Sequence, residues 1–253
     1  MDDIAVEVEG VDYIYSQSQK VHALRNVSFK VNTSEFVSFI GPSGCGKSTL
    51  LHLISGLLNP SKGVIHVNGK KSSSGLGRVA FMPQRDTLFP WRTVEKNAVL
   101  GAEILGIPRQ EALQKASSLF DLFGLSGFEK AWPSELSGGM RQRLALLRTF
   151  IIPRDTILLD EPFGSLDALT RHEMQQWLQQ IWDQDRRTII LVTHDVDEAI
   201  LLSDTIYVLS ERPGSIVQRV EINLERPRKK KVINSTEFTK IKSEIFQILS
   251  SGI

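Results

Sequence analysis

The chain has little that would indicate a secreted or membrane-spanning protein. It contains one cysteine, Cys45, in 253 residues, which excludes a disulfide framework and fits a reducing compartment. No apolar run approaches the roughly 18 residues needed to cross a bilayer. The acidic start Met1-Asp2-Asp3-Ile4 lacks the basic-then-apolar order of a signal peptide. We therefore expect a soluble, intracellular protein.

An excess of charge of either sign is also missing. The chain has 30 basic and 29 acidic side chains, a formal charge of +1. A nucleic-acid-binding surface spread over the whole chain would make it strongly basic, so we expect no nucleic-acid partner. Internal repeats and low-complexity tracts are absent, and the 41% hydrophobic content supports one large domain or two small ones.

Four short apolar runs predict fully buried strands. These runs are Phe36 to Ile40, Val79 to Met82, Thr156 to Leu159 and Thr188 to Val192. Strands that alternate with helical stretches favour a parallel α/β sheet, in which ligands bind outside the carboxyl ends of the strands. The residues that follow the four runs are Gly41, Gln84, Asp160 with Glu161, and Thr193 with His194. We expect these residues to converge on one site.

Helical spacing replaces the strand signals between Thr93 and Phe150. Val94 to Leu105 and Arg109 to Phe123 have apolar residues at helical intervals, which predicts a helical subdomain inserted into the α/β core. Near the end of the chain, Ile216 to Leu224 alternates like a strand. A C-terminal helix is expected beyond this strand, and Asn234 with Glu237 resembles the capping box that starts a helix. The apolar face of this helix would consist of Phe238, Ile241, Ile245 and Ile248.

A phosphate-binding loop follows the first predicted strand. Glycines let successive backbone N–H groups point inward, and the following helix adds its positive end. In this pattern a lysine reaches the β- and γ-phosphates and a serine holds Mg²⁺. Cys45 within the loop is either a thiol with a pKa lowered by the helix N-terminus or a small residue that fits. The loop is Gly41-Pro42-Ser43-Gly44-Cys45-Gly46-Lys47-Ser48-Thr49.

Two carboxylates, Asp160 and Glu161, end the third predicted strand. One carboxylate near Mg²⁺ suits metal binding, which usually includes water ligands. The next can polarise an attacking water if it lies within hydrogen-bond reach. An isolated acidic pair after a strand is usually only a loop, so its significance depends on the phosphate-binding loop in the same chain.

A second candidate anion site opens the helix after Leu136. Ser137 stands where an N-cap belongs, and Gly138 and Gly139 permit close backbone approach. A helix N-terminus of this kind attracts anions, although a well-capped helix is the alternative. The buried face of this helix is predicted to contain Met140, Leu144, Leu147 and Ile151.

These motifs, in this order, resemble those of ATP-binding cassette (ABC) ATPases over about residues 4–210. The resemblance implies an α/β fold with a P-loop NTPase core of ABC ATPase type, an inserted helical signature subdomain and a small C-terminal extension. The nucleotide-binding domain would cover 1–210, with the helical subdomain at about 86–150, and the extension 211–253. The motifs are the loop at 41–49, Gln84, Leu136–Gln142, Asp160-Glu161, Ser165-Leu166-Asp167 and His194.

The resemblance also implies roles for individual residues, with ATP and Mg²⁺ as cofactors. Two copies would pair head to tail, with ATP between the P-loop of one and the signature residues of the other: Ser137, Gly138, Gly139 and Gln142. Asp167 would lie at the dimer seam. Tyr15 would stack on adenine, with Tyr13 possible and a core tyrosine as the alternative. The catalytic roles would be Glu161 as base, His194 on the γ-phosphate, and Gln84 sensing Mg²⁺ and the attacking water. The metal site would consist of Ser48, Asp160 and Gln84.

Two further segments are similar to the ATPase subunits of nitrate, sulfonate, taurine and thiamine-precursor importers. One follows Gln84 and contains Phe89, Pro90 and Trp91; the other is Ser210 to Arg228. The resemblance implies docking of a permease subunit near Phe89-Pro90-Trp91, an indirect extracytoplasmic solute-binding partner, and a peripheral position on the cytoplasmic face of the inner membrane. Local core packing of Phe89 and Trp91 is the alternative.

Two questions stay open from the sequence. A non-transport ABC ATPase acting on nucleic acid or ribosomes is the alternative function, disfavoured by the single cassette and modest insertion. Five basic residues between Arg226 and Lys231 form either a solvated charge run or a patch attracted to anionic lipid. One departure from the family pattern is Ser34, where glycine is common.

Overall fold

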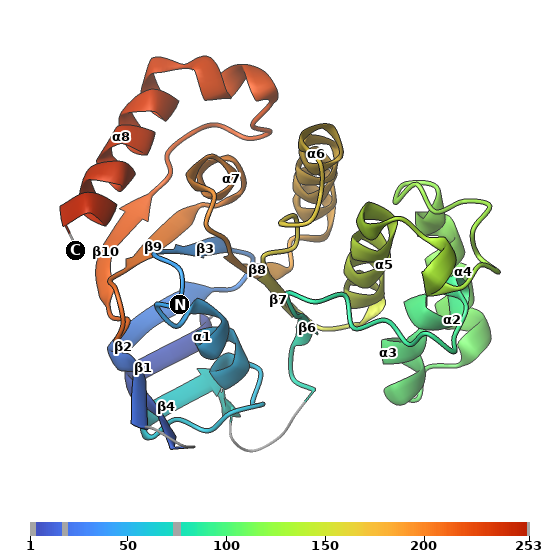
Figure 1. The fold of residues 1–253 in the computed structure, drawn as a ribbon, viewed down its shortest axis with the longest axis horizontal. Helices are drawn as coiled ribbons and strands as arrows, with labels where there is room; N and C mark the ends of the chain where they lie inside the picture. The colour runs from blue at the N-terminus through green and yellow to red at the C-terminus, as the bar shows by residue number, and fades with distance from the viewer. Residues whose placement is uncertain (1–3, 17–19, 73–76, 252–253) are drawn as a thin grey trace.

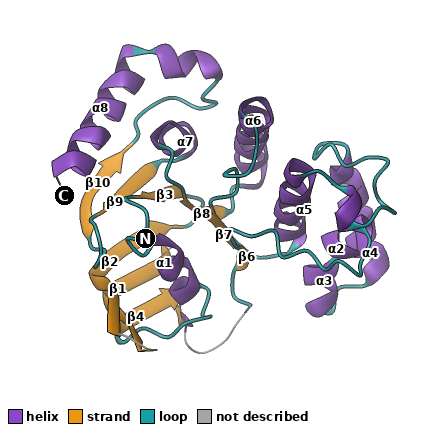
Figure 2. Ribbon diagram, viewed as in Figure 1, coloured by secondary structure: helices purple, strands orange, loops and turns teal. Residues whose placement is uncertain are grey.

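Two β-sheets form the core of the computed structural model, which describes residues 4–16, 20–72 and 77–251 (Figures 1 and 2). The first is antiparallel, with strand order β2-β1-β4-β5. The second has the order β10-β9-β3-β8-β7-β6 and is parallel except for β10 at its edge. The strands are β1 (Ile4–Ser16), β2 (Lys20–Asn32), β3 (Phe36–Ile40), β4 (Lys62–Val67), β5 (Lys70–Lys71), β6 (Ala80–Met82), β7 (Thr156–Asp160), β8 (Thr188–Val192), β9 (Thr205–Leu209) and β10 (Ile216–Glu221).

Helices cover the parallel sheet and extend beyond its β6 edge (Figure 1). They are α1 (Lys47–Ile54), α2 (Val94–Ala98), α3 (Leu100–Ile104), α4 (Arg109–Phe120), α5 (Gly138–Ile151), α6 (Ala168–Asp185), α7 (Val196–Leu202) and α8 (Thr236–Ser251), with short 3₁₀ turns at Pro133–Glu135 and Lys230–Asn234. Within the described ranges, none of these helices has both the length and the apolar character of a membrane span.

The predicted parallel sheet is confirmed. The strands β3 and β8 have the predicted bounds, and β6 and β7 differ from them by one residue at one end. Every residue of β3, β7, β8 and β9 is buried. Helices or the antiparallel sheet cover both faces, which explains why the sequence of these strands is almost continuously apolar.

The antiparallel sheet was not predicted from the sequence. Its long strands β1 and β2 are only partly buried and contain several register shifts, so their apolar residues do not alternate cleanly. The sheet packs against the parallel sheet through a shared hydrophobic cluster that includes Val8, Phe29, Phe39 and Leu53. Leu53 belongs to α1, so this cluster anchors the helix that follows the phosphate-binding loop.

The helices predicted between Thr93 and Phe150 form a separate group beside β6 and β7 (Figure 1). The first predicted helix is divided at Val99 into α2 and α3, and the second is α4. The predicted buried face of α5 is confirmed, since Leu144, Leu147 and Ile151 are buried and Met140 packs against the same cluster. The domain boundaries given above stay a prediction.

The C-terminal strand and helix are confirmed and pack against α7 and β9. Phe238 and Ile245 are fully buried with Ile200 and Val208, and Ile241 and Ile248 line the same cluster. The predicted cap is wrong in one detail. Asn234 ends a 3₁₀ turn, and Ser235 Oγ accepts the hydrogen bond from the Phe238 N–H at 3.2 Å.

Neither interpretation of the basic run holds for its two arginines. Arg228 is 2% exposed, and its guanidinium donates to the carbonyl oxygens of Ile200, Ser203, Ile222 and Leu224. Burial lowers the pKa of Arg228 to about 10. Arg226 lies 4.1 Å over the Trp182 ring and forms an ion pair with Asp204. Both arginines therefore attach the C-terminal segment to α6 and α7.

Candidate functional site

The carboxyl ends of β6, β7, β3 and β8 meet at one edge of the parallel sheet, as predicted. The phosphate-binding loop follows β3, Asp160 ends β7, and His194 comes two residues after β8. Gln84, two residues beyond β6, donates from Nε2 to Glu161 Oε2 at 3.1 Å. Side chains that are far apart in the sequence thus surround the carboxylate of Glu161.

The loop at 41–49 curls around its own lysine. Lys47 is 7% exposed, and Nζ donates to the carbonyl oxygens of Gly41 at 2.7 Å and Pro42 at 2.9 Å. Gly46 has a φ of +108°, and a Cβ there would lie 2.7 Å from Leu24 Cδ2. Glycine is therefore required at 46 both by conformation and by contact. Ser43 and Gly44 are exposed at the crest of the loop.

Cys45 is a packing residue of this loop. It is 1% exposed, and burial raises the pKa of its thiol despite Lys47 nearby. The alternative of a thiol whose pKa is lowered by the helix N-terminus is therefore not supported, and the alternative of a small residue that fits is.

The donor set next to the loop suits Mg²⁺. Ser48 Oγ donates to Asp160 Oδ1 at 3.1 Å, which places a hydroxyl and a carboxylate together. Asp160 is 3% exposed, and burial raises the pKa of its carboxyl. No group of three or more His, Cys, Asp or Glu side chains among the described residues forms a metal cluster. A single carboxylate that shares Mg²⁺ with substrate phosphates fits the usual preference of this ion.

Glu161 adopts a conformation that is uncommon for its residue type. Its φ of +47° is left-handed, which disfavours a residue with a Cβ by about 1–2 kcal/mol. A backbone hydrogen bond from Glu161 N to Val192 O at 2.9 Å holds the turn against β8. Strain of this kind often marks functional positions, and here it aims the carboxylate at Gln84 and His194.

His194 completes the group around Glu161. Its Nδ1 lies 3.4 Å from Glu161 Oε2, and its side chain is 67% exposed. The exposed ring can reach a molecule bound in front of the loop while it stays next to the carboxylate. The structure therefore brings together all three predicted catalytic side chains, Gln84, Glu161 and His194.

Tyr15 lies beside the phosphate-binding loop. Its hydroxyl is 3.0 Å from Thr49 Oγ1, and its ring contacts Tyr13 edge-on with centroids 4.8 Å apart. Both tyrosines are partly exposed, but Tyr13 packs against the hydrophobic cluster of the antiparallel sheet, whereas the hydroxyl of Tyr15 reaches Thr49. Of the two tyrosines, Tyr15 has the position from which a ring can stack on a base; that role stays a prediction.

The signature turn lies apart from the phosphate-binding loop within one chain. Ser137 caps α5 as predicted, accepting from the Met140 N–H at 3.2 Å. Ser137 and Gly138 are exposed. Figure 1 shows α5 in the helical group beyond β6 and β7, while α1 lies beside the antiparallel sheet. One chain alone does not join these two candidate anion sites.

Gln142, the last residue of the predicted signature set, is buried within its own chain. It is 5% exposed, and Nε2 donates to the Pro162 carbonyl at 3.0 Å. This hydrogen bond ties α5 to the turn that follows Glu161. The predicted role of Gln142 toward an opposite protomer stays a prediction. The long-range partner Pro162 could not be read from local sequence.

Asp167 has a structural role that the sequence interpretation missed. Its Oδ1 accepts from the N–H groups of Leu169 and Thr170 at 3.1 Å each and caps α6. Hydrogen bonds from Thr170 are the main cause of a lowered pKa for this carboxyl. The signal was present, since Asp directly before a helix is a favoured N-cap. Its place at a dimer seam stays a prediction.

The predicted docking residues include a stacked aromatic pair, in which Trp91 is exposed and Phe89 is half-buried. Trp91 is 69% exposed and stacks on Phe89 with centroids 5.0 Å apart and an angle of 14°. The buried Asn97 holds this turn, accepting from Phe89 N at 2.8 Å and donating to Arg92 O at 2.8 Å. Core packing does not account for Trp91, and Asn97 is a supporting residue that sequence reasoning missed.

Glu198, on α7 four residues after His194, is buried at 4% exposure. Gln175 Nε2 donates to its Oε2 at 3.1 Å. Burial raises the pKa of Glu198 to about 8, so this carboxyl is largely protonated at neutral pH. It links α6 to α7 and was not singled out from the sequence.

Replacing Glu198 by glutamine should stabilise the protein at alkaline pH. A raised folded-state pKa contributes stability that is complete below the unfolded value of 4.5 and is lost as pH rises through about 8. Glutamine keeps the acceptor for Gln175 and cannot ionise. We expect a gain of roughly 2–4 kcal/mol at pH 9 and little at pH 5, measured by urea denaturation. The control variant Glu173→Gln, at an exposed position, should leave the free energy of unfolding unchanged at both pH values. An equal gain for Glu198→Gln at pH 5 and pH 9 would contradict the raised pKa of Glu198.

Comparisons with known proteins agree with this geometry. A family model described as "ABC transporter" matches residues 24–164. An aliphatic sulfonates import ATP-binding protein of Bacillus cereus is 41% identical over 98% of this chain and 97% of its own length. A nitrate import ATP-binding protein of Synechocystis is 41% identical over 90% of this chain and 88% of its own length. A formylaminopyrimidine import ATP-binding protein of Halalkalibacterium halodurans is 41% identical over 90% of this chain and 89% of its own length.

A solved structure gives the same fold. The dimeric post-hydrolysis state of an ATP-binding cassette bound to ADP and Pi superimposes with a TM-score of 0.77 at 27% identity. It covers 87% of this chain and 100% of that one. The predicted P-loop NTPase fold, and the resemblance to the nitrate, sulfonate and thiamine-precursor branch, are thereby confirmed.

Proposed function

The chain belongs to the ABC transporter family of ATPases, and we propose that it is the ATP-hydrolysing motor subunit of a bacterial importer that takes up a small solute through a separate permease. The observation that carries the proposal is the contact of Gln84 and His194 with the Glu161 carboxylate, directly beside a phosphate-binding loop. The names of the import relatives support the direction of transport.

Different residues of the site bind the phosphates, hold the metal and activate water. Lys47 and the loop N–H groups bind the phosphates, and Ser48, Asp160 and Gln84 hold Mg²⁺. When bound, Mg²⁺ neutralises charge on the phosphate oxygens. Glu161 accepts a proton from the attacking water, as a base within hydrogen-bond reach does. His194 donates to the γ-phosphate, and Tyr15 stacks on adenine.

A second copy of the chain completes the site. The Ser137–Gly139 turn is exposed and remote from its own P-loop, so it serves the ATP bound to its partner. Two helix N-termini and a lysine hold a triphosphate more strongly than one helix N-terminus does. ATP therefore binds the closed dimer better than the open form, and this differential affinity supplies the work.

The permease docks at the stacked pair of the half-buried Phe89 and the exposed Trp91. A solute-binding protein outside the membrane acts through that permease. The chain lies on the cytoplasmic face of the inner membrane as a peripheral subunit. The transported solute is of the sulfonate, nitrate, taurine or pyrimidine-precursor type. Similar import proteins are named for aliphatic sulfonates, nitrate and formylaminopyrimidine.

Replacing Trp91 by alanine should weaken permease binding. An exposed aromatic anchor at the centre of an interface contributes about 2 kcal/mol or more, so recovery of the membrane subunit with the tagged chain should fall by at least about tenfold. ATP binding by the isolated chain should not change, since Trp91 lies outside the nucleotide site. The measurement is copurification from detergent-solubilised membranes of the source cell, with the copurified protein identified by mass spectrometry.

The matched control is Trp132→Ala, which removes a tryptophan that is 45% exposed elsewhere in the helical group. Equal loss of the membrane subunit in both variants would remove the docking assignment. Copurification of the wild-type chain with ribosomes or nucleic acid, and with no membrane protein, would overturn the importer proposal in favour of a non-transport ATPase.

A further inference from the structure

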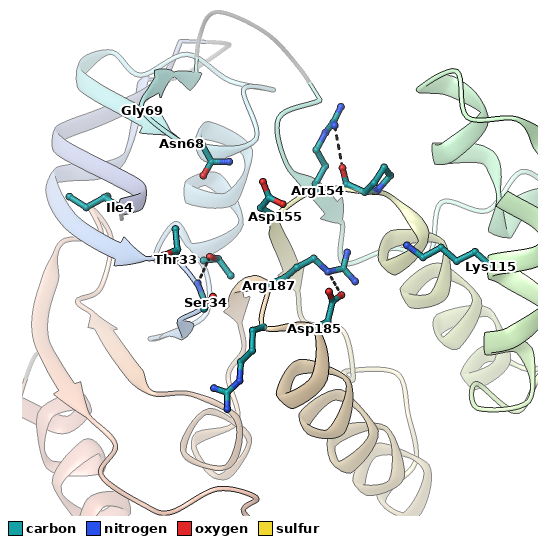
Figure 3. Close-up of a pocket in the computed structure, with 13 residues that line it drawn as sticks. Ile4, Thr33, Ser34, Asn68, Gly69, Lys115, Arg154, Asp155, Asp185 and Arg187 are labelled. Atoms are coloured by element: carbon teal, nitrogen blue, oxygen red, sulfur yellow. Dashed lines mark hydrogen bonds and ion pairs between the residues drawn. The ribbon is translucent and has the colours of Figure 1, made fainter. Parts of the chain in front are cut away.

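A cavity of about 850 Å³ opens at the edge of the parallel sheet opposite the nucleotide site (Figure 3). Ser34 precedes β3, Asp155 precedes β7 and Arg187 precedes β8, so the amino ends of three parallel strands form its floor. Asn68 from the antiparallel sheet and Lys115 from α4 form opposite walls. Three parts of the fold therefore meet at this cavity, and none of its residues belongs to the proposed ATPase machinery.

The lining has more cationic than anionic side chains. It includes Lys115, Arg154, Arg186 and Arg187 against the carboxylates of Asp155 and Asp185. The chain as a whole has a formal charge of only +1, so this excess is local. A concave polar surface with an excess of cations raises the local concentration of anions.

Two of these cations are held in place by the protein and shape the cavity. Arg187 donates to Asp185, and also to the carbonyl oxygens of Phe150 and Ile152 at 3.3 Å. Its guanidinium also lies 5.1 Å from the Phe150 ring centroid. Arg186 lies 4.4 Å over the Trp182 ring and 3.7 Å from Asp183. The positive charges of Arg186 and Arg187 are therefore largely compensated by carboxylates and aromatic rings of the protein itself.

The other two cations are not neutralised. Arg154 donates to the carbonyl oxygens of Gly77 and Pro153, which leaves its positive charge without a carboxylate partner in those contacts. The Lys115 ammonium makes no ion pair or hydrogen bond with any side chain or carbonyl of residues 4–16, 20–72 and 77–251. In Figure 3, Lys115 extends from the helical group toward the cavity that Arg154 and Asp155 border from the sheet side.

We propose that this cavity binds a small organic anion, with its oxoanion group (phosphate, sulfonate or carboxylate) between Lys115 and Arg154 and its remaining polar atoms toward Asn68 and Ser34. The volume lies in the range of small-molecule sites, about 300–1,000 Å³, and exceeds what a single inorganic ion fills. Arginine and lysine are the side chains that recognise oxoanions through charge-assisted hydrogen bonds. The bound anion bridges α4 and the parallel sheet.

Isothermal titration tests the proposal with inorganic phosphate, ethanesulfonate and citrate as probes, each at constant ionic strength. Saturating ADP with Mg²⁺ occupies the phosphate-binding loop, so that anion binding there does not contribute. We expect saturable binding of at least one probe, and the probe preferred identifies the oxoanion class. The tryptophan fluorescence should change in parallel, because Trp182 lies under Arg186.

The Lys115→Ala/Arg154→Ala double variant should weaken this binding by at least about tenfold. The Lys231→Ala/Lys240→Ala variant removes the same charge from exposed positions elsewhere and should leave the affinity unchanged. Asp155→Asn removes a carboxylate that repels the anion and should strengthen binding severalfold. This variant tests the site even if the Lys115→Ala/Arg154→Ala double variant fails to fold. Absence of saturable binding for all three probes, or equal weakening in both double variants, would overturn the proposal.

Discussion

Glu161→Gln should lower the rate of ATP hydrolysis by roughly 10²–10⁴-fold, the range that general-base catalysis supplies. The amide has nearly the same volume and keeps an oxygen that accepts from Gln84 Nε2, 3.1 Å away. It cannot take a proton from water. Nucleotide binding should be retained, because Lys47, Ser48 and the loop N–H groups are unchanged. The variant should therefore accumulate with ATP bound and as a dimer.

Phosphate release and size-exclusion chromatography with ATP and Mg²⁺ measure the two parts of this expectation. Glu111→Gln, an exposed carboxylate on α4, is the matched control and should hydrolyse ATP like the wild type. Normal turnover in Glu161→Gln would show that the carboxylate is not the base, and loss of ATP binding would show that its role is structural.

Lys47→Ala should act at an earlier step and weaken nucleotide binding itself. Its ammonium is held inside the loop by the carbonyls of Gly41 and Pro42. A charge-assisted contact of this kind contributes about 1.5–3 kcal/mol, so the Kd for ATP should rise roughly 10- to 100-fold. Dimer formation with ATP should disappear with it.

Equilibrium binding of a fluorescent ATP analogue gives this affinity directly. The control is Lys62→Ala, which removes a side chain that is 79% exposed on β4. A Kd within about twofold of the wild-type value for Lys47→Ala would contradict the assignment of the phosphate-binding loop. A similar rise in both variants would indicate only a general charge effect.

The parallel sheet and the core of the site were predictable because their information is local. Buried parallel strands are apolar along their whole length, and the polar residue after each strand lies at the same edge of the sheet. This rule alone brought Gln84, Glu161 and His194 together. The structure adds the left-handed turn at Glu161, with a φ of +47°, which local sequence does not reveal.

Other features depend on partners far away in the chain and could not be predicted. Gln142 bonds Pro162, and Arg228 bonds carbonyls near the end of α7 that lie up to 28 positions earlier. A basic run was therefore interpreted as surface although two of its arginines are structural. The antiparallel sheet was missed because its long, half-buried strands contain register shifts. Ser34 has a φ of +60°, a left-handed conformation that glycine adopts without strain. This accounts for the glycine that ABC ATPases commonly have at this position.

The most direct test of the account is complementation between two inactive variants. Lys47→Ala disables the phosphate-binding loop, and Gly138→Asp places a negative charge on the exposed signature turn, where an added Cβ would meet only Arg141 at 3.8 Å. Each variant alone should hydrolyse almost no ATP. A mixed dimer contains one site with an unchanged loop and an unchanged turn.

If each ATP lies between two copies, an equimolar mixture should recover up to about a quarter of the wild-type activity, because half of the random dimers are mixed and each has one intact site of two. The ATPase rate as a function of mixing ratio measures this recovery. A rate equal to the sum of the two separate variants at every ratio would contradict a site shared between copies.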